Sequence, residues 1–423
     1  MDPEGEVPTF SPEPPALVGG REPWPWLTSD VAGVPARIRE RQEDFRVHEI
    51  PRERPEGRGE HILFQVEKRG IPTHQLVSAL ARELGVDRRA FGVAGRKDAR
   101  AVTTQWLSVE GVSEDRIRRV TLPGVRILEM GRHPRKLHVG ALLGNRFELR
   151  LRGVDPAHLR RIMTVLPSLE IRGVPNYFGP QRFGSRGDSA VVGRALLRSD
   201  WEGALRTLAG DPQDQDTPLI HRARAAFDAG RYGEAAELWP PAFREPRLVN
   251  RLLAEGKRSE EAVRAVGRRM LDLYRSAYQS WLFNALLSVR IEEIDHLHPG
   301  DLALRHADGA LVEIAHPAHH DEGVSGGRLS PTGPLFGPRM RRPSGEVQRL
   351  EEGILAWAGV RAGEFARRRG NRRMGLRRPL RFGLGEAAVS SGTDAHGPYV
   401  ELRFRLDPGC YATAVLREVV KGE

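Results

Sequence analysis

A single carboxylate stands among three cations in one short segment of this chain. Asp98 follows Arg96 and Lys97 and precedes Arg100, with glycines close by. The residues on either side are rich in β-formers, so we expect a charged loop held between two strands. Neighbouring cations favour the ionised form of a carboxyl group. Asp98 is therefore a candidate nucleophile or general base for a substrate that arrives on a polyanion.

Asp98 also has a purely structural interpretation. Aspartate often satisfies backbone N–H groups in a turn, and the strands expected at 91–94 and 102–109 require a turn between them. On spacing alone, this structural role is the better supported of the two.

A second segment, 175–184, combines three aromatic residues, an amide pair and an arginine between proline and glycine. Its central residues are Asn176, Tyr177 and Phe178. Packing into the core explains most buried aromatic residues. Because adjacent strand residues point to opposite faces, we expect at least one of Tyr177 and Phe178 to be core.

The charge balance favours a polyanionic partner. The 423 residues include 66 Lys and Arg against 56 Asp and Glu, a formal net charge of +10. Residues 366–381 are the most basic segment, with eight arginines and no carboxylate. Such a segment binds RNA through charge, with an affinity that falls steeply as salt rises. The alternative is a solvated charged surface, which many of these arginines form individually.

Several functional classes are not supported by the sequence. No apolar run approaches the roughly 20 residues that span a bilayer, and the acidic N-terminus does not resemble a signal peptide, so we expect a cytoplasmic protein without a membrane anchor. The single cysteine, Cys410, excludes an intrachain disulfide and is expected to be a small buried residue. Histidines in 316–321 suggest either a metal site or a polar loop, and we favour the loop. Phosphate-binding and dinucleotide-binding glycine motifs are absent, so no cofactor and no metal are predicted.

The hydrophobic pattern alternates between strand and helix along the chain. Period-two alternation predicts strands at 61–68, 145–152 and 400–406, each with one buried face, as in antiparallel sheets. A helix is predicted from Thr73, as its cap, to Leu84, with Gly85 after its end.

The middle of the chain is different. Helical spacing runs from about 201 to 289, a loop-rich stretch covers 295–340, and a further helix is expected over 346–367. Strands return only after about 379. This order predicts an α+β protein in which one sheet domain is interrupted by an inserted second domain.

Five separated segments, in this order, resemble the TruD-type tRNA pseudouridine synthases. They span about 39–418 when the Glu-Asp-Phe motif ending at Phe45 is included, and they are FGVAGRKDARAVTTQW at 91–106, KLHVGALLGNRF at 136–147, PNYFGPQRFG at 175–184, SAYQSWLFN at 276–284 and PGCYATAVLRE at 408–418. A single match would be weak, but the ordered set is specific.

The resemblance implies a mainly antiparallel pseudouridine synthase sheet domain interrupted by an inserted, α-rich TruD-type domain. Residues 1–25 are rich in Pro, Gly and Glu with little periodicity, which predicts a flexible leader. On the family pattern we expect a discontinuous catalytic domain at 26–200 and 377–423, and an insertion at 201–376. Within the insertion, about 201–275 is similar to extra helical material in longer members of the family.

The resemblance also implies an isomerase that converts one uridine of tRNA, at position 13 in the D arm, to pseudouridine. The match at Gly-Arg-Lys-Asp98 favours the catalytic interpretation of Asp98 over the interpretation as a structural turn residue. It implies that Asp98 is the catalytic aspartate. It acts either by attacking C1′ or by taking the C2′ proton, and both routes stay open. Phe178 is implied to stack on the uracil ring, where stacking is worth roughly 1–3 kcal/mol per base. Asn176 is implied either to bond the uracil edge or to brace the Asp98 loop.

A basic residue accompanies the catalytic carboxylate in pseudouridine synthases. Arg39 occupies the position of the family's lysine before the Glu-Asp-Phe motif, and Arg96 and Lys97 are the alternatives. The expected partner is tRNA, with no protein partner and a monomeric enzyme.

Two other functions remain as alternatives. One is a non-catalytic tRNA-binding or RNA-folding protein, and the other is a synthase that acts on another RNA. Binding a polyanion gives no reason to keep a carboxylate at position 98, which argues against the first.

Overall fold

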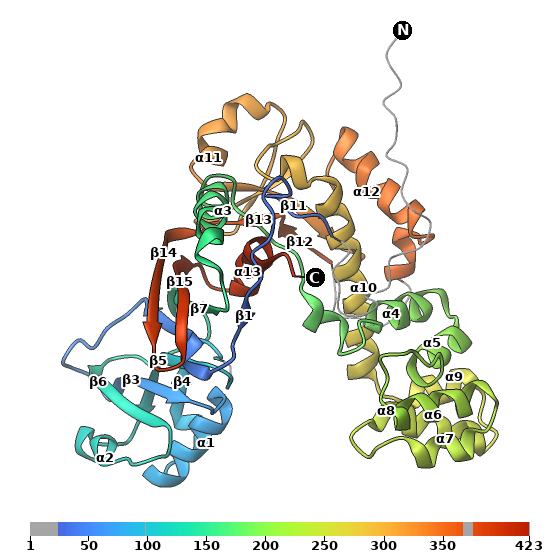
Figure 1. The fold of residues 1–423 in the computed structure, drawn as a ribbon, viewed down its shortest axis with the longest axis horizontal. Helices are drawn as coiled ribbons and strands as arrows, with labels where there is room; N and C mark the ends of the chain where they lie inside the picture. The colour runs from blue at the N-terminus through green and yellow to red at the C-terminus, as the bar shows by residue number, and fades with distance from the viewer. Residues whose placement is uncertain (1–23, 98, 367–374, 423) are drawn as a thin grey trace. The chain divides into compact units, whose positions relative to one another are not determined.

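The computed structural model describes residues 24–97, 99–366 and 375–422 (Figure 1). Asp98, most of the expected leader and the arginine-rich residues 367–374 lie outside the described residues. Among the helices that the structure describes, none is both long and apolar enough to cross a bilayer.

The chain forms two compact units, here named the sheet unit and the insert unit. The sheet unit comprises residues 26–174 and 382–422, and the insert unit comprises 175–381 together with residues 24 and 25. These compact units divide the chain at 174/175 and 381/382, while the domain bounds expected from the sequence, 200/201 and 376/377, stay a prediction. The change in composition near residue 201 marks the start of the extra helices. The insert unit itself begins earlier, at residue 175.

The sheet unit is built on a nine-stranded sheet with the order β14-β15-β7-β2-β5-β3-β6, in which β1 also pairs with β7 and β4 with β5. Every neighbouring pair is antiparallel except β2 and β5. This confirms the mainly antiparallel sheet. The strands are β1 (Arg37–Ile38), β2 (Phe45–Pro51), β3 (His61–Arg69), β4 (Phe91–Val93), β5 (Val102–Glu110), β6 (Val125–His133), β7 (Leu142–Arg152), β14 (Gly385–Asp394) and β15 (Gly397–Leu406).

The core of the sheet unit follows from the alternation seen in the sequence. Phe147 of β7 stacks on its cross-strand partner Phe404 of β15 with ring centroids 5.4 Å apart, and Phe45 of β2 meets Phe147 edge-on at 6.3 Å. Such aromatic cross-strand contacts stabilise a sheet and fix its register. The helices of this unit are η2 (Gln42–Asp44), α1 (Thr73–Leu84), η3 (Arg88–Ala90), α2 (Glu114–Arg118), η4 (Pro156–His158), α3 (Leu159–Arg172) and α13 (Ala412–Val420).

Helix α1 has the predicted bounds, but its first residue has another role. Leu76, Leu80 and Leu84 form the buried stripe, and Gly85 ends the helix in the left-handed conformation, with φ of 61°. Thr73 is not the cap, because Pro72 occupies that position without a side-chain cap bond. The Thr73 hydroxyl is bonded to other residues instead, as described below.

The insert unit is mainly helical and centres on α10 (Arg268–Val289), which is buried continuously from Ser276 to Leu287. Figure 1 shows α5 to α9 gathered as a helical group, and α5, α6, α8 and α9 contribute to one apolar core with α4 and α10. The remaining helices are α4 (Ser189–Arg198), α5 (Trp201–Ala209), α6 (Pro218–Asp228), α7 (Tyr232–Leu238), α8 (Arg244–Ala254), α9 (Ser259–Ala265), α11 (Asp321–Ser325), α12 (Gly345–Trp357), η5 (Pro180–Phe183), η6 (Ile291–Glu293), η7 (Pro317–His320) and η8 (Ala362–Ala366).

The stretch expected to be loop-rich carries strands. A four-stranded sheet has the order β10-β9-β11-β12, and β8 pairs with β13 in a separate two-stranded sheet. The sequence signal was weak because these strands are short and β11 contains two prolines. A buried arginine, Arg377, supports β11 by donating to the Thr332 hydroxyl at 3.0 Å and to the Thr332 carbonyl at 2.7 Å. The strands are β8 (Val174–Pro175), β9 (Leu302–Arg305), β10 (Leu311–Glu313), β11 (Leu329–Leu335), β12 (Leu376–Pro379) and β13 (Arg381–Phe382).

Three smaller expectations are corrected. Trp24 lies at the end of the expected leader but is 6% exposed and stacks on Tyr177 in the insert unit. The helix expected over 346–367 ends at Trp357, because Gly359 turns with a positive φ of 64° before η8. Cys410 is partly exposed instead of buried.

Candidate functional site

The residue before Asp98 is held by side chains from three other elements of the sheet unit. The Lys97 N–H donates to the Thr73 hydroxyl at 2.8 Å, and the Lys97 carbonyl accepts from the Lys68 ammonium at 3.4 Å. The Thr73 hydroxyl in turn donates to the Gln105 side chain at 2.8 Å. The backbone next to the predicted catalytic residue is therefore fixed by α1, β3 and β5.

The side chain of Lys97 is directed into the protein. Its ammonium lies 3.1 Å from Glu49 Oε2 and donates to Asn145 Oδ1 at 2.5 Å. The Lys97 and Glu49 side chains are only 7% and 0% exposed. The second oxygen of Glu49 accepts from the backbone N–H of Trp106 at 3.0 Å. Lys97 thus contacts β2 and β7, and Glu49 extends the connection to β5. The buried carboxylate of Glu49 neutralises the charge of Lys97.

Lys68 is a further buried cation at this site, which the sequence analysis did not select. It is fully buried at the end of β3, and its ammonium donates to the Ile71 carbonyl at 2.7 Å as well as to that of Lys97. The sequence already indicated that the Lys68 side chain faces the protein interior. Lys68 continues the inward-facing series of Ile62, Phe64 and Val66, where a further apolar residue would be expected.

The two arginines selected near the loop lie in different surroundings. Arg96 is exposed. Arg39 is partly buried, its backbone adopts the left-handed conformation with φ of 57°, and its guanidinium carbon lies 3.9 Å from the centroid of the Phe45 ring. Left-handed backbone is uncommon for a residue other than glycine, so the surrounding structure holds Arg39 in this position.

In the insert unit, Phe178 forms the centre of a second cluster. Its ring is partly exposed, the guanidinium carbon of Arg378 lies 4.2 Å from the ring centroid, and Phe283 of α10 meets the ring edge-on at 5.6 Å. Tyr177 is buried against Trp24, which confirms that one of the two adjacent aromatics is core. The ring that remains at the surface is the one expected to contact a base.

Asn284 of α10 holds the backbone of Phe178. The Phe178 N–H donates to Asn284 Oδ1 and the Asn284 amide donates to the Phe178 carbonyl, both at 2.9 Å. Asn284 is fully buried, so the position of the ring is set from the rigid helix.

Asn176 is bound at both ends of its amide. Its Nδ2 donates to the Pro379 carbonyl at 2.8 Å, and its Oδ1 accepts from the Arg378 guanidinium. Arg378 also donates to the Asn176 backbone carbonyl at 3.3 Å. The structure therefore brings together Asn176, Phe178 and Arg378 in one unit, and Lys97 with Glu49, Asn145 and Lys68 in the other.

Nothing in the described part of the chain resembles a metal centre. No three His, Cys, Asp or Glu side chains there are grouped so as to hold an ion. Residues 316–321 form the turn η7 and the start of α11, with the rings of His316 and His319 5.3 Å apart.

Comparison with known proteins gives one consistent family. The family model of tRNA pseudouridine synthase D (TruD) matches residues 24–419. The tRNA pseudouridine synthase D of Geobacter metallireducens is 42% identical over 398 residues, which cover 94% of this chain and 98% of that protein. The one from Geotalea daltonii is 39% identical, with coverage of 94% and 99%. A crystal structure assigned to tRNA pseudouridine synthase D, from Methanosarcina mazei, has a TM-score of 0.83 at 28% identity and covers 96% of this chain and 97% of its own.

Proposed function

Because the chain belongs to the tRNA pseudouridine synthase D family and is an isomerase that forms pseudouridine in tRNA, we propose that its target is uridine 13 of the D arm. The observation that carries the assignment is the family match over 24–419, which includes both segments that place the candidate site. The reaction breaks the N1–C1′ bond, turns the base and joins C5 to C1′. It involves no net oxidation or hydrolysis, so its chemistry requires neither a redox cofactor nor a nucleotide.

Asp98 is the proposed catalytic carboxylate, either as the nucleophile at C1′ or as the base at C2′. The contacts that hold the preceding residue, Lys97, support this role. The backbone at Lys97 is fixed by Thr73 and Lys68, and the Lys97 side chain is ion-paired beneath the loop. A fixed loop favours catalysis, because misplacement of a reacting group by about 1 Å can cost roughly 100-fold in rate.

Lys68 is the proposed cation of the catalytic carboxylate. Its ammonium is buried and bonded to the carbonyl of the residue that precedes Asp98. Lys97, in contrast, is proposed to position the loop, because its charge is already paired with Glu49. The exposed Arg96 and the partly buried Arg39 are proposed to contact the RNA.

Phe178 is the proposed stacking surface for the uracil, and Asn176 the residue that holds Arg378 beside it. The partial exposure of the Phe178 ring and its fixed backbone support this assignment. A flipped base needs a flat apolar surface of this kind. We also propose that the enzyme works as a cytoplasmic monomer on its tRNA substrate.

The target position is tested by mapping pseudouridine at single-nucleotide resolution on unmodified tRNA transcripts. We expect one modified site, at position 13, and no modification elsewhere when uridine 13 is replaced by cytidine. Modification at another position, or of another RNA only, would contradict the assignment of uridine 13.

A further inference from the structure

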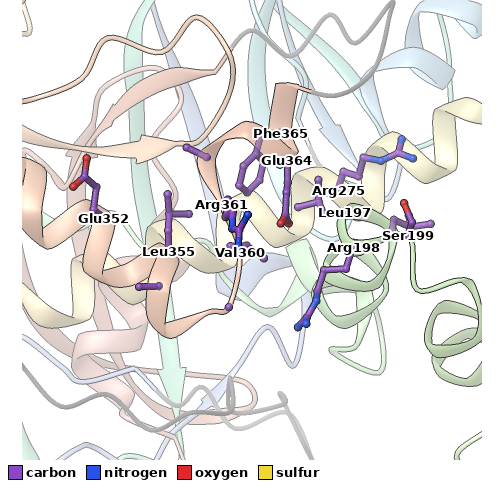
Figure 2. Close-up of a pocket in the computed structure, with 14 residues that line it drawn as sticks. Leu197, Arg198, Ser199, Arg275, Glu352, Leu355, Val360, Arg361, Glu364 and Phe365 are labelled. Atoms are coloured by element: carbon purple, nitrogen blue, oxygen red, sulfur yellow. The ribbon is translucent and has the colours of Figure 1, made fainter.

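The insert unit contains a cavity that the proposed catalytic residues do not use. Its volume is about 900 Å³, within the range of roughly 300–1,000 Å³ that is typical of small-ligand sites. Figure 2 shows Arg198 of α4 and the following Ser199 on one side, Glu352 and Leu355 of α12 on the other, and the 360–365 segment between them. All of its described lining residues belong to the insert unit, so the cavity is defined within one compact body.

Arginines gather at this cavity. Arg198, Arg275 and Arg361 line it, and Arg194 lies one helical turn before Arg198 on the same face of α4. The guanidinium groups of Arg194 and Arg198 approach the same point, since a Cβ placed on Gly359 would lie 3.8 Å from one and 3.7 Å from the other. Within the described part of the chain, neither arginine has a hydrogen-bonding or ion-pair partner. Like charges at i, i+4 on a helix repel each other, and an anion bound between the two guanidinium groups would offset this repulsion.

The cavity also contains an acceptor and an apolar wall. Glu364 has a buried carboxylate oxygen, Oε2, that bonds to no other described residue, and Arg275 has a buried Nη2 in the same condition. Leu355, Val360 and Phe365 supply buried apolar surface. A carboxylate repels a bare phosphate but accepts a hydrogen bond from a ribose 2′-OH or a base N–H. The combination therefore fits a whole nucleotide better than an isolated anion.

We propose that this cavity binds a nucleotide of the substrate RNA away from the reacting uridine, with Arg194 and Arg198 on its phosphate and Glu364 on its sugar or base. Arginine suits the phosphate because its planar guanidinium donates two parallel hydrogen bonds. The proposal rests on the proposed function for the identity of the RNA. It gives the family's inserted unit a specific contact with tRNA, separate from the Phe178 cluster.

The test compares two double variants that each remove two positive charges from the insert unit. Arg194→Gln/Arg198→Gln alters the cavity, while Arg258→Gln/Arg349→Gln alters arginines whose side chains are 80% and 74% exposed. The dissociation constant for unmodified tRNA transcript is measured over a salt series, with the melting temperature of each variant. We expect binding at least 10-fold weaker for the cavity variant, with a salt slope smaller by about 1, and a change under 2-fold for the control. Equal affinities for the two variants would overturn the proposal.

A third variant keeps all the arginines. Ala356→Glu adds a carboxylate to the wall at an exposed position of α12, so no buried contact is lost. Ala356→Glu should weaken tRNA binding by a similar factor. If the double variant fails to fold, this variant alone tests whether the cavity binds a nucleotide of tRNA. Wild-type affinity in Ala356→Glu would contradict the proposal.

Pseudouridine formation is recorded in the same samples. If the wild type modifies tRNA and the cavity variants bind as it does, the proposed function stands and the cavity proposal falls. If the wild type binds tRNA but modifies no uridine, the proposed function fails, and the affinities still decide whether the cavity holds RNA.

Discussion

Asn284 holds both backbone polar groups of Phe178, a residue 106 positions away in the sequence, through two hydrogen bonds of 2.9 Å. An amide side chain can accept from an N–H through its oxygen and donate to a carbonyl through its nitrogen at the same time, so Asn284 pairs both backbone groups. The ring proposed to receive the uracil is therefore mounted on the longest helix of the insert unit. If Phe178 stacks on the uracil as proposed, we expect Asn284 to act as a positioning residue for the reaction.

Replacement of Asn284 tests this role. Asn284→Ala leaves two backbone groups of Phe178 without partners, at a cost of about 1–3 kcal/mol each. We expect kcat to fall at least 10-fold, approaching the effect of Phe178→Leu, in steady-state assays on tRNA transcripts. The matched control is Asn250→Ala, because Asn250 is also fully buried and its side chain donates to the Pro246 carbonyl, one turn earlier in α8, instead of to a candidate site residue. Unchanged kcat in both Asn variants would show that Asn284 serves stability alone.

The ion pair of Lys97 with Glu49 gives a second prediction. Removing one partner of a buried pair typically costs about 3–5 kcal/mol, because the other charge stays buried without compensation. We expect Lys97→Met and Glu49→Gln each to lower the free energy of unfolding by about this amount in urea titrations. The double variant should lose less than the sum of the two. Strictly additive losses would mean that the two side chains do not interact.

Lys68 provides a third prediction, which concerns catalysis. Lys68→Met preserves the length and packing of a buried side chain while it removes the ammonium next to the Lys97 carbonyl. We expect kcat to fall at least 10-fold with the tRNA dissociation constant within 2-fold of wild type. Lys257→Met, at an exposed site in the insert unit, is the control and should leave both quantities unchanged. Wild-type kcat in Lys68→Met would remove Lys68 from the mechanism.

The acid stability of the sheet unit should depend on Asp394. Hydrogen bonds from Arg152 and from the His396 N–H hold the pKa of this carboxyl well below its usual range. A carboxyl group with a lowered pKa stabilises the folded state above its unfolded pKa, and that stability is lost as the pH falls below about 4. We therefore expect unfolding curves of wild type to show declining stability as the pH falls from about 4 to about 2. Asp394→Asn should flatten this decline, and an unchanged slope would contradict the assignment.

The local hydrophobic pattern of the sequence predicted many of the helices and strands. It did not predict the side-chain partners at the candidate site, because these depend on contacts between residues far apart in the sequence. The bounds of α1 and the strand alternation around Phe147 and Phe404 follow from neighbouring residues alone. The partners of Phe178 do not, because Asn284 and Arg378 are brought to it only by folding. The same holds for Thr73, whose position suggested a cap but whose hydroxyl supports the backbone of Lys97. Lys68 differs from these residues, because the alternation of β3 already indicated in the sequence that its side chain faces the interior.

The central claim is that Asp98 performs the chemistry of pseudouridine formation, and one paired measurement tests it most directly. Wild type and Asp98→Asn are assayed side by side for pseudouridine in unmodified tRNA transcripts, with RNA binding recorded in the same samples. We predict that wild type converts one uridine while the variant binds with similar affinity and converts none. Conversion by Asp98→Asn at a rate close to that of wild type would contradict the mechanism proposed here.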